Sequence, residues 1–347
     1  MNVGIVGATG YGGNELYRLL TKHPKIEKCI LYTSSSSGDG KAYRDSYPHL
    51  TEISQESLSI IDGKRIEEEV ETLFLASPPG AAAELLRKIN SNQVKIIDLS
   101  GDLRLKDSSL YEQWYKRQPA DQKIVDQAVY GLAELNKQEI KNAAILSNPG
   151  CFPTASILGL APAAAQSLIK ESSIIIDAKT GVSGAGRKPG AAVHYAEINE
   201  NLKIYKVNGH QHIPEIEQAL HLLNENISTI TFQTHLVPMT RGIMATIYVD
   251  LKEEMSSEQL LDCYQTFYRD SYFVRVRPLG EFPSTKEVYG SNYCDIGLSY
   301  DERTGRATIV SVIDNLMKGA AGQAVQNFNI MNGYEETLGL ELAPIFP

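Results

Sequence analysis

The sequence predicts an α/β protein in which a doubly wound, mainly parallel sheet is followed by a second α/β domain. Over about the first 148 residues, short apolar strand patterns alternate with helical ones, as they do in such a sheet. A glycine-rich turn at residues 7–13 directly follows the first strand pattern. The length of 347 residues fits two domains, since roughly 100–200 residues form one.

The first domain begins with a strand, a turn and a helix. Residues 2–6 are apolar, the turn follows, and residues 14–20 have the amphipathic spacing of a helix. Further apolar runs predict strands at 26–32, 72–76 and 94–99 and a helix at 81–89, and the turn residues at 60–64 predict a hairpin.

The second half combines one long helical pattern with several strands. A helix is expected near residues 154–169, and strand patterns follow at 173–178, 227–236, 244–250, 273–276 and 306–313. No repeat or low-complexity linker separates the two halves.

Charge and composition limit the classes of molecule that this protein is expected to bind. Hydrophobic residues make up 42% of the chain and charged residues 22%, which is typical of a globular protein. The net charge of −9 repels phosphate backbones and anionic lipids, so neither nucleic acid nor a membrane surface is expected. The uncharged stretch 143–169 contains three prolines and several polar residues, so we interpret it as buried protein rather than a membrane span.

The cysteines and the N-terminal residues predict a cytoplasmic protein. Cys29, Cys151, Cys263 and Cys294 form no CxxC pair and no Cys/His spacing of a metal site. We therefore expect free thiols in a reducing compartment and no bound metal. The chain opens on a strand pattern rather than on the basic and apolar regions of a signal peptide.

The turn Gly7-xx-Gly10-xx-Gly13 is a variant of the dinucleotide-binding fingerprint. Its glycines allow a tight turn and let a pyrophosphate approach the positive end of the next helix. The second strand pattern then runs into Ser34, Ser35 and Ser37, with Lys41 beyond and without the carboxylate that holds NAD ribose. These groups favour the 2′-phosphate of NADP, and a plain solvated serine loop is the alternative.

Cys151 is the chemically most distinctive residue. It lies in the turn Ser147-Asn148-Pro149-Gly150-Cys151 immediately before a helical pattern. A helix N-terminus stabilises a thiolate, and its N–H groups can hold an oxyanion. The alternative is that Cys151 is a small buried apolar residue.

A thiol nucleophile needs a base, and His210 and His212 stand in a turn before a helical pattern. Their i, i+2 spacing does not suit a helical metal pair. Taken singly, a histidine in such a turn is more often an ordinary surface or helix-start residue than a catalyst.

Two further segments could bind an anion. Lys179, Ser183 and Arg187 lie in the glycine-rich run 179–188 after a strand pattern, and Arg241 lies near the end of another. A mobile solvated loop and a surface arginine are the corresponding alternatives.

Taken together, eight ordered segments resemble the N-acetyl-γ-glutamyl-phosphate reductase family of the aspartate-semialdehyde and glyceraldehyde-phosphate dehydrogenase superfamily. They are GATGYGG at 7–13, DLSGDLR at 98–104, YGLAE at 130–134, SNPGCFPT at 147–154, KTGVSGAGR at 179–187, GHQHIPEIEQ at 209–218, HLVPMTRGI at 235–243 and DNLMKGAAGQAVQN at 314–327. The sequence departs from the family at Phe152, where Tyr is usual, and at Gly101, where Ala is usual.

The resemblance implies an NADP-binding Rossmann-type domain at residues 1–148, completed by a C-terminal helix at 316–347. Residues 149–315 would form the catalytic, substrate and dimerisation domain, with a mixed sheet of glyceraldehyde-phosphate-dehydrogenase-like type. The protein would be a homodimer or homotetramer.

The implied reaction is the NADPH-dependent reduction of N-acetyl-γ-glutamyl phosphate to the 5-semialdehyde, in arginine biosynthesis, through a thioester on Cys151. His210 would be the acid and base, with His212 as the second candidate. The implied cofactor residues are Gly7, Thr9, Gly10, Tyr11, Gly12, Gly13, Ser34, Ser35, Ser37, Asn315, Gly319 and Gln323, and the implied substrate residues are Asn148, Lys179, Ser183, Arg187 and Arg241.

Three other functions stay open at this point. Aspartate-semialdehyde dehydrogenase performs the same chemistry on a substrate one carbon shorter. A cysteine acyl hydrolase would use Cys151 and His210 without hydride transfer, and a non-catalytic NADP sensor would use neither. The acetyl or succinyl cap of the substrate is not encoded in any of these motifs.

Overall fold

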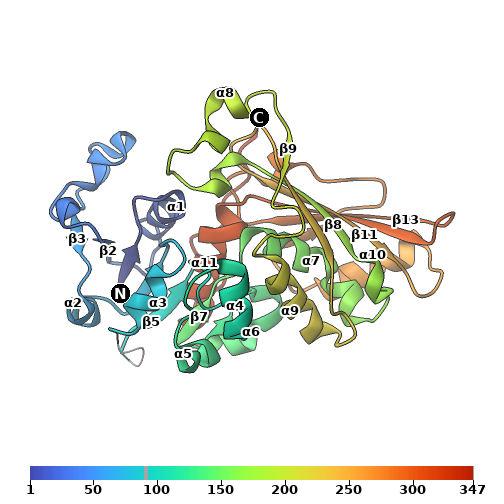
Figure 1. Ribbon diagram of the computed structural model, residues 1–347, viewed down its shortest axis with the longest axis horizontal. Coiled ribbons are helices and arrows are strands. Elements are labelled where there is room, and N and C mark those ends of the chain that lie inside the picture. The colour runs from blue at the N-terminus through green and yellow to red at the C-terminus, as the bar shows by residue number, and fades with distance from the viewer. Residues whose placement is uncertain (90–92, 347) are drawn as a thin grey trace. The chain divides into compact units, whose positions relative to one another are not determined.

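The computed structural model describes residues 1–89 and 93–346, which form two compact units (Figure 1). The first comprises residues 1–149 and 320–341, and the second 150–319 and 342–347. The expected boundary placed all of 316–347 in the first domain. Residues 316–319 and 342–347 instead join the second unit, because Gly319 packs against Cys151 and the N–H of Ile345 donates to the carbonyl of Tyr289. The chain therefore crosses between the units three times.

Parallel strands form the sheet of the first unit. Among the described residues it has seven strands in the order β3-β2-β1-β4-β5-β7-β6, and every neighbouring pair is parallel. The strands are β1 (Asn2–Val6), β2 (Lys28–Thr33), β3 (Leu58–Ile60), β4 (Thr72–Leu75), β5 (Lys95–Asp98), β6 (Val129–Tyr130) and β7 (Ile145–Ser147). The inner strands β1, β4, β5 and β7 are buried along almost their whole length, because helices cover both faces of such a sheet. The doubly wound fold is confirmed.

Helices supply the outer layers of this unit. They are α1 (Tyr11–Leu20), α2 (Gly63–Glu69), α3 (Ala81–Leu86), α4 (Ser108–Tyr115), α5 (Gln122–Gln127), α6 (Ala133–Lys141) and α11 (Gly322–Met331). All ten residues of α11 are buried. Its Phe328 packs on Phe74 of β4, with ring centroids 5.8 Å apart, and its Asn329 hydrogen-bonds to His23 at 2.8 Å. This late segment of the chain therefore completes the core of the first unit.

The hairpin predicted at residues 60–64 is wrong. Asp62 caps the N-terminus of α2, where its carboxylate accepts the backbone N–H of Arg65 at 2.9 Å. The Asp-Gly pair is a hairpin signal and also an N-cap signal, and the helical residues that follow decide between them.

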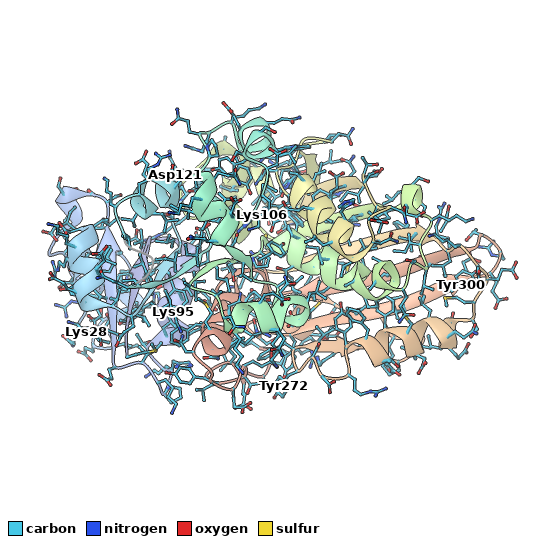
Figure 2. The ribbon with its side chains drawn as sticks, turned by 90° about the horizontal axis from the view of Figure 1, so that it is seen from below. Lys28, Lys95, Lys106, Asp121, Tyr272 and Tyr300 are labelled. Atoms are coloured by element: carbon cyan, nitrogen blue, oxygen red, sulfur yellow. The ribbon has the colours of Figure 1, made fainter. Side chains whose placement is uncertain are left out.

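A mixed sheet forms the second unit. Its order among the described residues is β12-β13-β14-β11-β8-β10-β9, with parallel pairs only at β8/β10 and β12/β13. The strands are β8 (Ile175–Thr180), β9 (Lys203–Tyr205), β10 (Thr231–Leu236), β11 (Ile243–Asp250), β12 (Val274–Val276), β13 (Cys294–Asp301) and β14 (Arg306–Ile313). Figure 2 shows Tyr300 near the end of the long strand β13. The predicted second α/β domain is confirmed.

One face of this sheet is covered by helices and the other is largely open. The helices of the unit are α7 (Cys151–Ala165), α8 (Tyr195–Ile198), α9 (Ile213–Leu223) and α10 (Ser257–Phe267). Every residue from Phe152 to Ala164 of α7 is buried, which agrees with its uncharged sequence. No helix in the described part of the chain is both long and apolar enough to cross a bilayer. On the opposite face, alternate side chains of β8, β10 and β11 are partly exposed.

Strand β13 was not predicted because Asp295 and Gly297 interrupt its apolar pattern. Asp295 is nevertheless fully buried, and it is paired with Arg275 at 2.6 Å and Arg277 at 2.7 Å. A buried carboxylate requires such partners, which come from β12 and the residue after it.

Candidate active site

Cys151 occupies the first position of α7, directly after the residues that leave β7. Both backbone groups of the preceding Gly150 are fixed, since its N–H donates to Glu215 at 2.8 Å and its carbonyl accepts the N–H and the hydroxyl of Thr154 at 2.9 Å. Glu215 is fully buried in the first turn of α9. Cys151 itself is partly exposed and not disulfide-bonded. The thiol thus lies at the positive end of a 15-residue helix, where a thiolate is stabilised.

His210 and His212 lie beside the start of α7. The ring of Phe152 packs edge-on against both, at centroid distances of 5.4 and 6.0 Å, and the two imidazoles are 4.7 Å apart. Both histidines are buried. The structure thus brings the two predicted histidines to the residue next to Cys151.

The surroundings of His210 fix its protonation state. The Nδ1 atom of His210 accepts the backbone N–H of His212 at 3.1 Å, so Nδ1 carries no proton. Burial, followed by the charge of Lys206, lowers the pKa of His210 to about 3. His210 is therefore a neutral imidazole with its proton on Nε2.

Two aromatic residues complete this site and were missed by sequence reasoning. The ring of Tyr205 is 5.9 Å from that of His210, and the ring of Phe232 is 5.6 Å from it. Burial raises the pKa of Tyr205, and the negative charge of a Cys151 thiolate adds to this rise. Tyr205 ends β9 a few residues before His210, and Phe232 lies in β10, well beyond His212, and no motif indicated either of them.

Gly319 forms one wall of the nucleophile site. It lies in a π-helical turn at Met317–Ala321, and a Cβ atom added to it would be 2.8 Å from the Cβ of Cys151. Only a glycine leaves room for the cysteine at this contact. Asn315, a few residues earlier, accepts the N–H of Gly242 at 2.8 Å and donates to the hydroxyl of Ser183 at 2.9 Å.

The predicted anion-binding residues separate into two groups. Arg241 is mostly buried 3.3 Å from the carboxylate of Asp314, and Ser183 contacts Asn315, so both belong to the network around Gly319. Lys179 pairs with Asp177 at 2.6 Å on the face of the sheet that α7 does not cover. Arg187 lies in the exposed part of its loop.

In the first unit, the turn after β1 has the geometry of a dinucleotide site. Gly7 has a positive φ of 85°, and a Cβ on Gly13 would lie 2.3 Å from the Gly7 carbonyl oxygen. An added Cβ on Gly12 would meet nothing within 4 Å. Gly13 therefore serves the packing of α1 on the turn, while Gly12 leaves the backbone open to a ligand.

Two tyrosines brace this turn from a distant loop, and no sequence motif indicated them. The Tyr43 hydroxyl donates to the Ala8 carbonyl at 2.9 Å, and the Tyr47 hydroxyl lies 3.0 Å from the Thr9 carbonyl and 3.1 Å from that of Gly10. The Gly10 N-cap of α1 has no side-chain cap, so the free N–H groups of this helix suit a phosphate. Tyr11 is partly exposed at the first helical position.

The serine loop after β2 is exposed and polar. The hydroxyls of Ser35 and Ser37 are 2.8 Å apart, and Ser34 lies in the same loop. The carboxylate of Asp39 accepts the backbone N–H of Ile60 at 2.9 Å. The loop therefore presents hydroxyl groups to a ligand rather than a carboxylate.

Gln323 and Asn148 lie at the carboxyl ends of the same parallel sheet. The Asn148 amide donates to the Ala320 carbonyl at 3.2 Å and accepts from Asn327 at 3.0 Å. The Gln323 amide donates to the Gly131 carbonyl at 3.0 Å, while its buried carbonyl oxygen has no hydrogen-bond partner among the described residues. This orphan acceptor fits an amide donor such as the nicotinamide carboxamide. The residues of the first unit therefore fit a nicotinamide dinucleotide.

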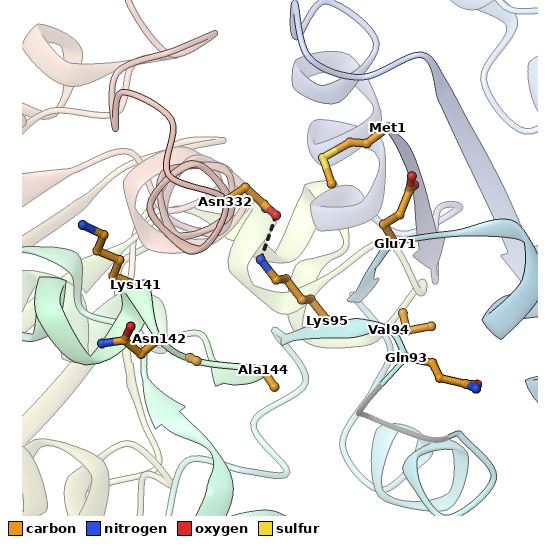
Figure 3. A pocket seen from close by; sticks show the side chains of 10 residues that line it. Met1, Glu71, Gln93, Val94, Lys95, Lys141, Asn142, Ala144 and Asn332 are labelled. Carbon is orange, nitrogen blue, oxygen red and sulfur yellow. Dashed lines mark hydrogen bonds between the residues drawn. The ribbon is translucent and has the colours of Figure 1, made fainter.

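A pocket of about 560 Å³ opens at the end of this sheet that is opposite to the carboxyl ends of its strands (Figure 3). Lys95, at the start of β5, donates there to the Met331 carbonyl at 2.7 Å and to the Asn332 side chain at 2.9 Å. The pocket thus lies at the amino ends of the strands, away from the dinucleotide turn.

Comparison with known proteins agrees with this arrangement. Residues 2–143 match the family described as semialdehyde dehydrogenase, NAD binding domain, and residues 151–315 match semialdehyde dehydrogenase, dimerisation domain. Proteins named N-acetyl-gamma-glutamyl-phosphate reductase are 61% identical in a Geobacillus species and 59% in Bacillus subtilis, each over 100% of both chains.

Solved structures share the fold. A probable aspartate-semialdehyde dehydrogenase from Pseudomonas aeruginosa superposes with a TM-score of 0.72 at 19% identity, covering 96% of this chain and 98% of that one. Aspartate semialdehyde dehydrogenase with NADP from Candida albicans gives 0.70 at 16% identity, with coverage of 95% and 98%. The fold, the thiol site and the full-length identity together place the chain in the N-acetyl-γ-glutamyl-phosphate reductase family.

Proposed function

We propose that the protein reduces N-acetyl-γ-glutamyl phosphate to the 5-semialdehyde through a covalent intermediate on Cys151. The observation that carries this is the thiol at the positive end of α7, with two histidines beside the next residue. The sulfur forms a bond to the acyl carbon, the bond from that carbon to the phosphate oxygen breaks, and a thioester results. NADPH, when bound, would supply the hydride for the reduction of the thioester carbon. The thiolate leaves as the aldehyde forms.

His212 is the proton-transfer residue in this proposal, and His210 is a hydrogen-bond donor. A pKa of about 3 keeps His210 neutral at any working pH, so it is a poor base. Its Nε2–H is a fixed donor, suited to the carbonyl oxygen that gains charge in the reaction. His212 then takes the proton of the Cys151 thiol.

The pH profile of kcat/KM distinguishes the two histidines. Replacing His212 by Gln should lower kcat/KM by about 10²-fold or more and remove the ionisation on the acidic side of the profile. Replacing His210 by Gln should lower kcat while leaving that ionisation where it is, because His210 carries no charge at roughly pH 5 to 9. A shifted acidic limb in the His210 variant would assign the proton to His210 instead.

Arg241 and Ser183 are the proposed substrate-anion residues near the thiol. Arg241 brings a planar guanidinium that suits a carboxylate or phosphate, and Ser183 is joined to the same network through Asn315. Arg187 is proposed to contribute from its exposed loop. Lys179 is the weakest of the set, because Asp177 neutralises it on the other face of the sheet.

The first unit is the proposed NADPH site. The glycine turn and the N-terminus of α1 would hold the pyrophosphate, Ser34, Ser35 and Ser37 would bind the 2′-phosphate, and Gln323 would accept a hydrogen bond from the carboxamide. The preference for NADP over NAD rests on the exposed hydroxyls of this loop and on the absence of a carboxylate at residues 33–38.

The reverse reaction tests the function. Incubation of the protein with N-acetylglutamate 5-semialdehyde, NADP and phosphate should produce NADPH only when phosphate is present. The succinylated analogue determines the preferred acyl cap, and aspartate semialdehyde tests the shorter substrate. Silence with all three aldehydes would refute the reductase proposal.

We also propose that the protein is a cytoplasmic homodimer formed through the open face of the second sheet. The matched dimerisation domain spans this unit, and the partly exposed side chains of β8, β10 and β11 form a continuous surface on it. Ile175 is 38% exposed at this face, where its backbone pairs with Tyr248 and Thr231. A second copy would bury these groups. None of the four cysteines is disulfide-bonded, which suits a reducing compartment.

Charge placed on this face should dissociate the dimer. Ile175→Glu introduces a carboxylate near Asp177, and burying two such charges is costly. Light scattering should then give the monomer mass. Leu222→Glu is the matched control, because Leu222 is 80% exposed on α9. An unchanged mass for Ile175→Glu would exclude this face as the interface.

A further inference from the structure

Asp314 is a buried carboxylate to which neither the motifs nor the proposed chemistry assign a role. It follows β14 directly and is 0% exposed. Burying a carboxylate is unfavourable unless donors surround it, so its position needs an explanation in terms of those donors.

The donors come from three separate segments of the second unit. One carboxylate oxygen accepts the N–H groups of Leu316 and Met317 at 2.8 and 3.1 Å. The other accepts the N–H of Gly290 at 2.8 Å and lies 3.3 Å from the guanidinium of Arg241. Asp314 therefore joins the segment before β11, the segment before β13 and the turn that follows β14.

Hydrogen bonds from these segments connect Asp314 to residues beside Cys151 and Arg241. The N–H of Gly319 donates to the Asp314 carbonyl at 3.0 Å, which closes the π-helical turn whose glycine contacts Cys151. Asn315, the next residue, holds Gly242 and Ser183. A π-helical turn is an uncommon conformation that occurs mainly at functional sites. The backbone carbonyl of Asp314 thus closes the turn beside the thiol, while its carboxylate holds the start of that turn and Arg241.

Arg241 is held on two sides. Its guanidinium lies beside Asp314 and over the ring of Tyr289, at 5.8 Å from the ring centroid. The Tyr289 carbonyl accepts the N–H of Ile345, so the last residues of the chain support the same segment. A guanidinium fixed in this way presents its donors in one orientation, which is what recognition of a carboxylate or phosphate requires.

We propose that Asp314 is a positioning residue that orients Arg241 for the substrate anion and holds the Gly319 turn against Cys151. The inference rests on the proposed function, because it assumes that Arg241 binds the acyl substrate. Asp314 touches neither the substrate nor the thiol in this account.

A double-mutant cycle tests the coupling. Asp314→Asn and Arg241→Gln should each raise the KM of the semialdehyde by about 10-fold or more. The KM of the double variant should equal that of Arg241→Gln within about twofold. Both substitutions act on the same contact between Arg241 and the substrate, so their effects on KM should not add. Asp314→Asn should lower kcat further than Arg241→Gln does, since it also loosens the Gly319 turn. A KM that stays at the wild-type value in Asp314→Asn, or KM effects that multiply in the double variant, would overturn the proposal.

Asp295→Asn is the matched control. Asp295 is equally buried and paired with two arginines in the same unit, but it does not bond to Arg241 or to the turn at Gly319. Its replacement should lower the melting temperature while leaving KM unchanged. Asp314→Glu keeps the negative charge but changes its position. It replaces Asp314→Asn in the test if that variant does not fold, and it should also raise KM.

Alkylation of Cys151 separates this proposal from the proposed function. Negatively charged iodoacetate should react faster, relative to neutral iodoacetamide, when Arg241 is held near the thiol. The ratio of the two rates should fall at least threefold in Asp314→Asn and in Arg241→Gln, and stay constant in Asp295→Asn. This readout needs no turnover. An unchanged ratio in Asp314→Asn refutes the positioning role, whereas a wild type silent on all substrates refutes only the reductase proposal.

Discussion

Cys151→Ser should abolish the phosphate-dependent formation of NADPH, with kcat at least about 10³-fold below that of the wild type. The hydroxyl of serine is far less acidic than a thiol, so the helix N-terminus at Gly150 cannot make it an effective nucleophile. The two side chains are close in size, and the packing against Gly319 should be kept. NADPH binding, measured by fluorescence, should therefore be unchanged.

The other cysteines provide the control for this result. Cys263 is buried on α10, and burial raises the pKa of its thiol to about 11, so it is an inert apolar residue. Cys263→Ser should retain full kcat. Substantial turnover by Cys151→Ser would show that the acyl group is never attached to this residue.

Gly13→Ala should disrupt the dinucleotide turn and with it the binding of NADPH. The new Cβ would lie 2.3 Å from the Gly7 carbonyl oxygen and 2.7 Å from the Cα of Ala8, and backbone atoms cannot move aside as a flexible side chain can. We expect the first unit to lose several kcal/mol of stability, on the order of other overpacked cores. The Kd for NADPH should rise by about 10²-fold or more.

Gly12→Ala separates packing from ligand approach in the same turn. Nothing lies within 4 Å of the added Cβ, so the melting temperature should be that of the wild type. If the pyrophosphate lies against this backbone, the Kd for NADPH should still rise. Unchanged NADPH binding in Gly12→Ala together with weak binding in Gly13→Ala would show that the turn is structural only.

The sequence predicted the elements whose signals are local. The strand, glycine turn and helix at the N-terminus, and Cys151 at the first position of a helix, are each contained in a few consecutive residues. The same locality explains the placement of His210 and His212, which share one loop with the start of α9.

What the sequence could not show depends on residues far apart in the chain. Strand β13 requires Arg275 and Arg277 to neutralise Asp295, and the dinucleotide turn is braced by Tyr43 and Tyr47 from another loop. The orientation of Lys179 toward the open face follows from the pairing of β8 within the sheet. Such contacts arise only when the whole fold is assembled, and no spacing pattern encodes them.

The place of α11 in the first unit has a consequence for how the protein is made. Ribosomes release the chain from its N-terminus, and domains that are continuous in sequence can fold as they emerge. The first unit is not continuous, because its core needs Phe328, which leaves the ribosome after residues 150–319. The core of the nascent first unit therefore stays incomplete, with the apolar surface around Phe74 exposed, while the second unit is synthesised. During that interval we expect it to bind chaperones that recognise apolar surfaces, and a chain released before residue 322 should be unable to complete this core.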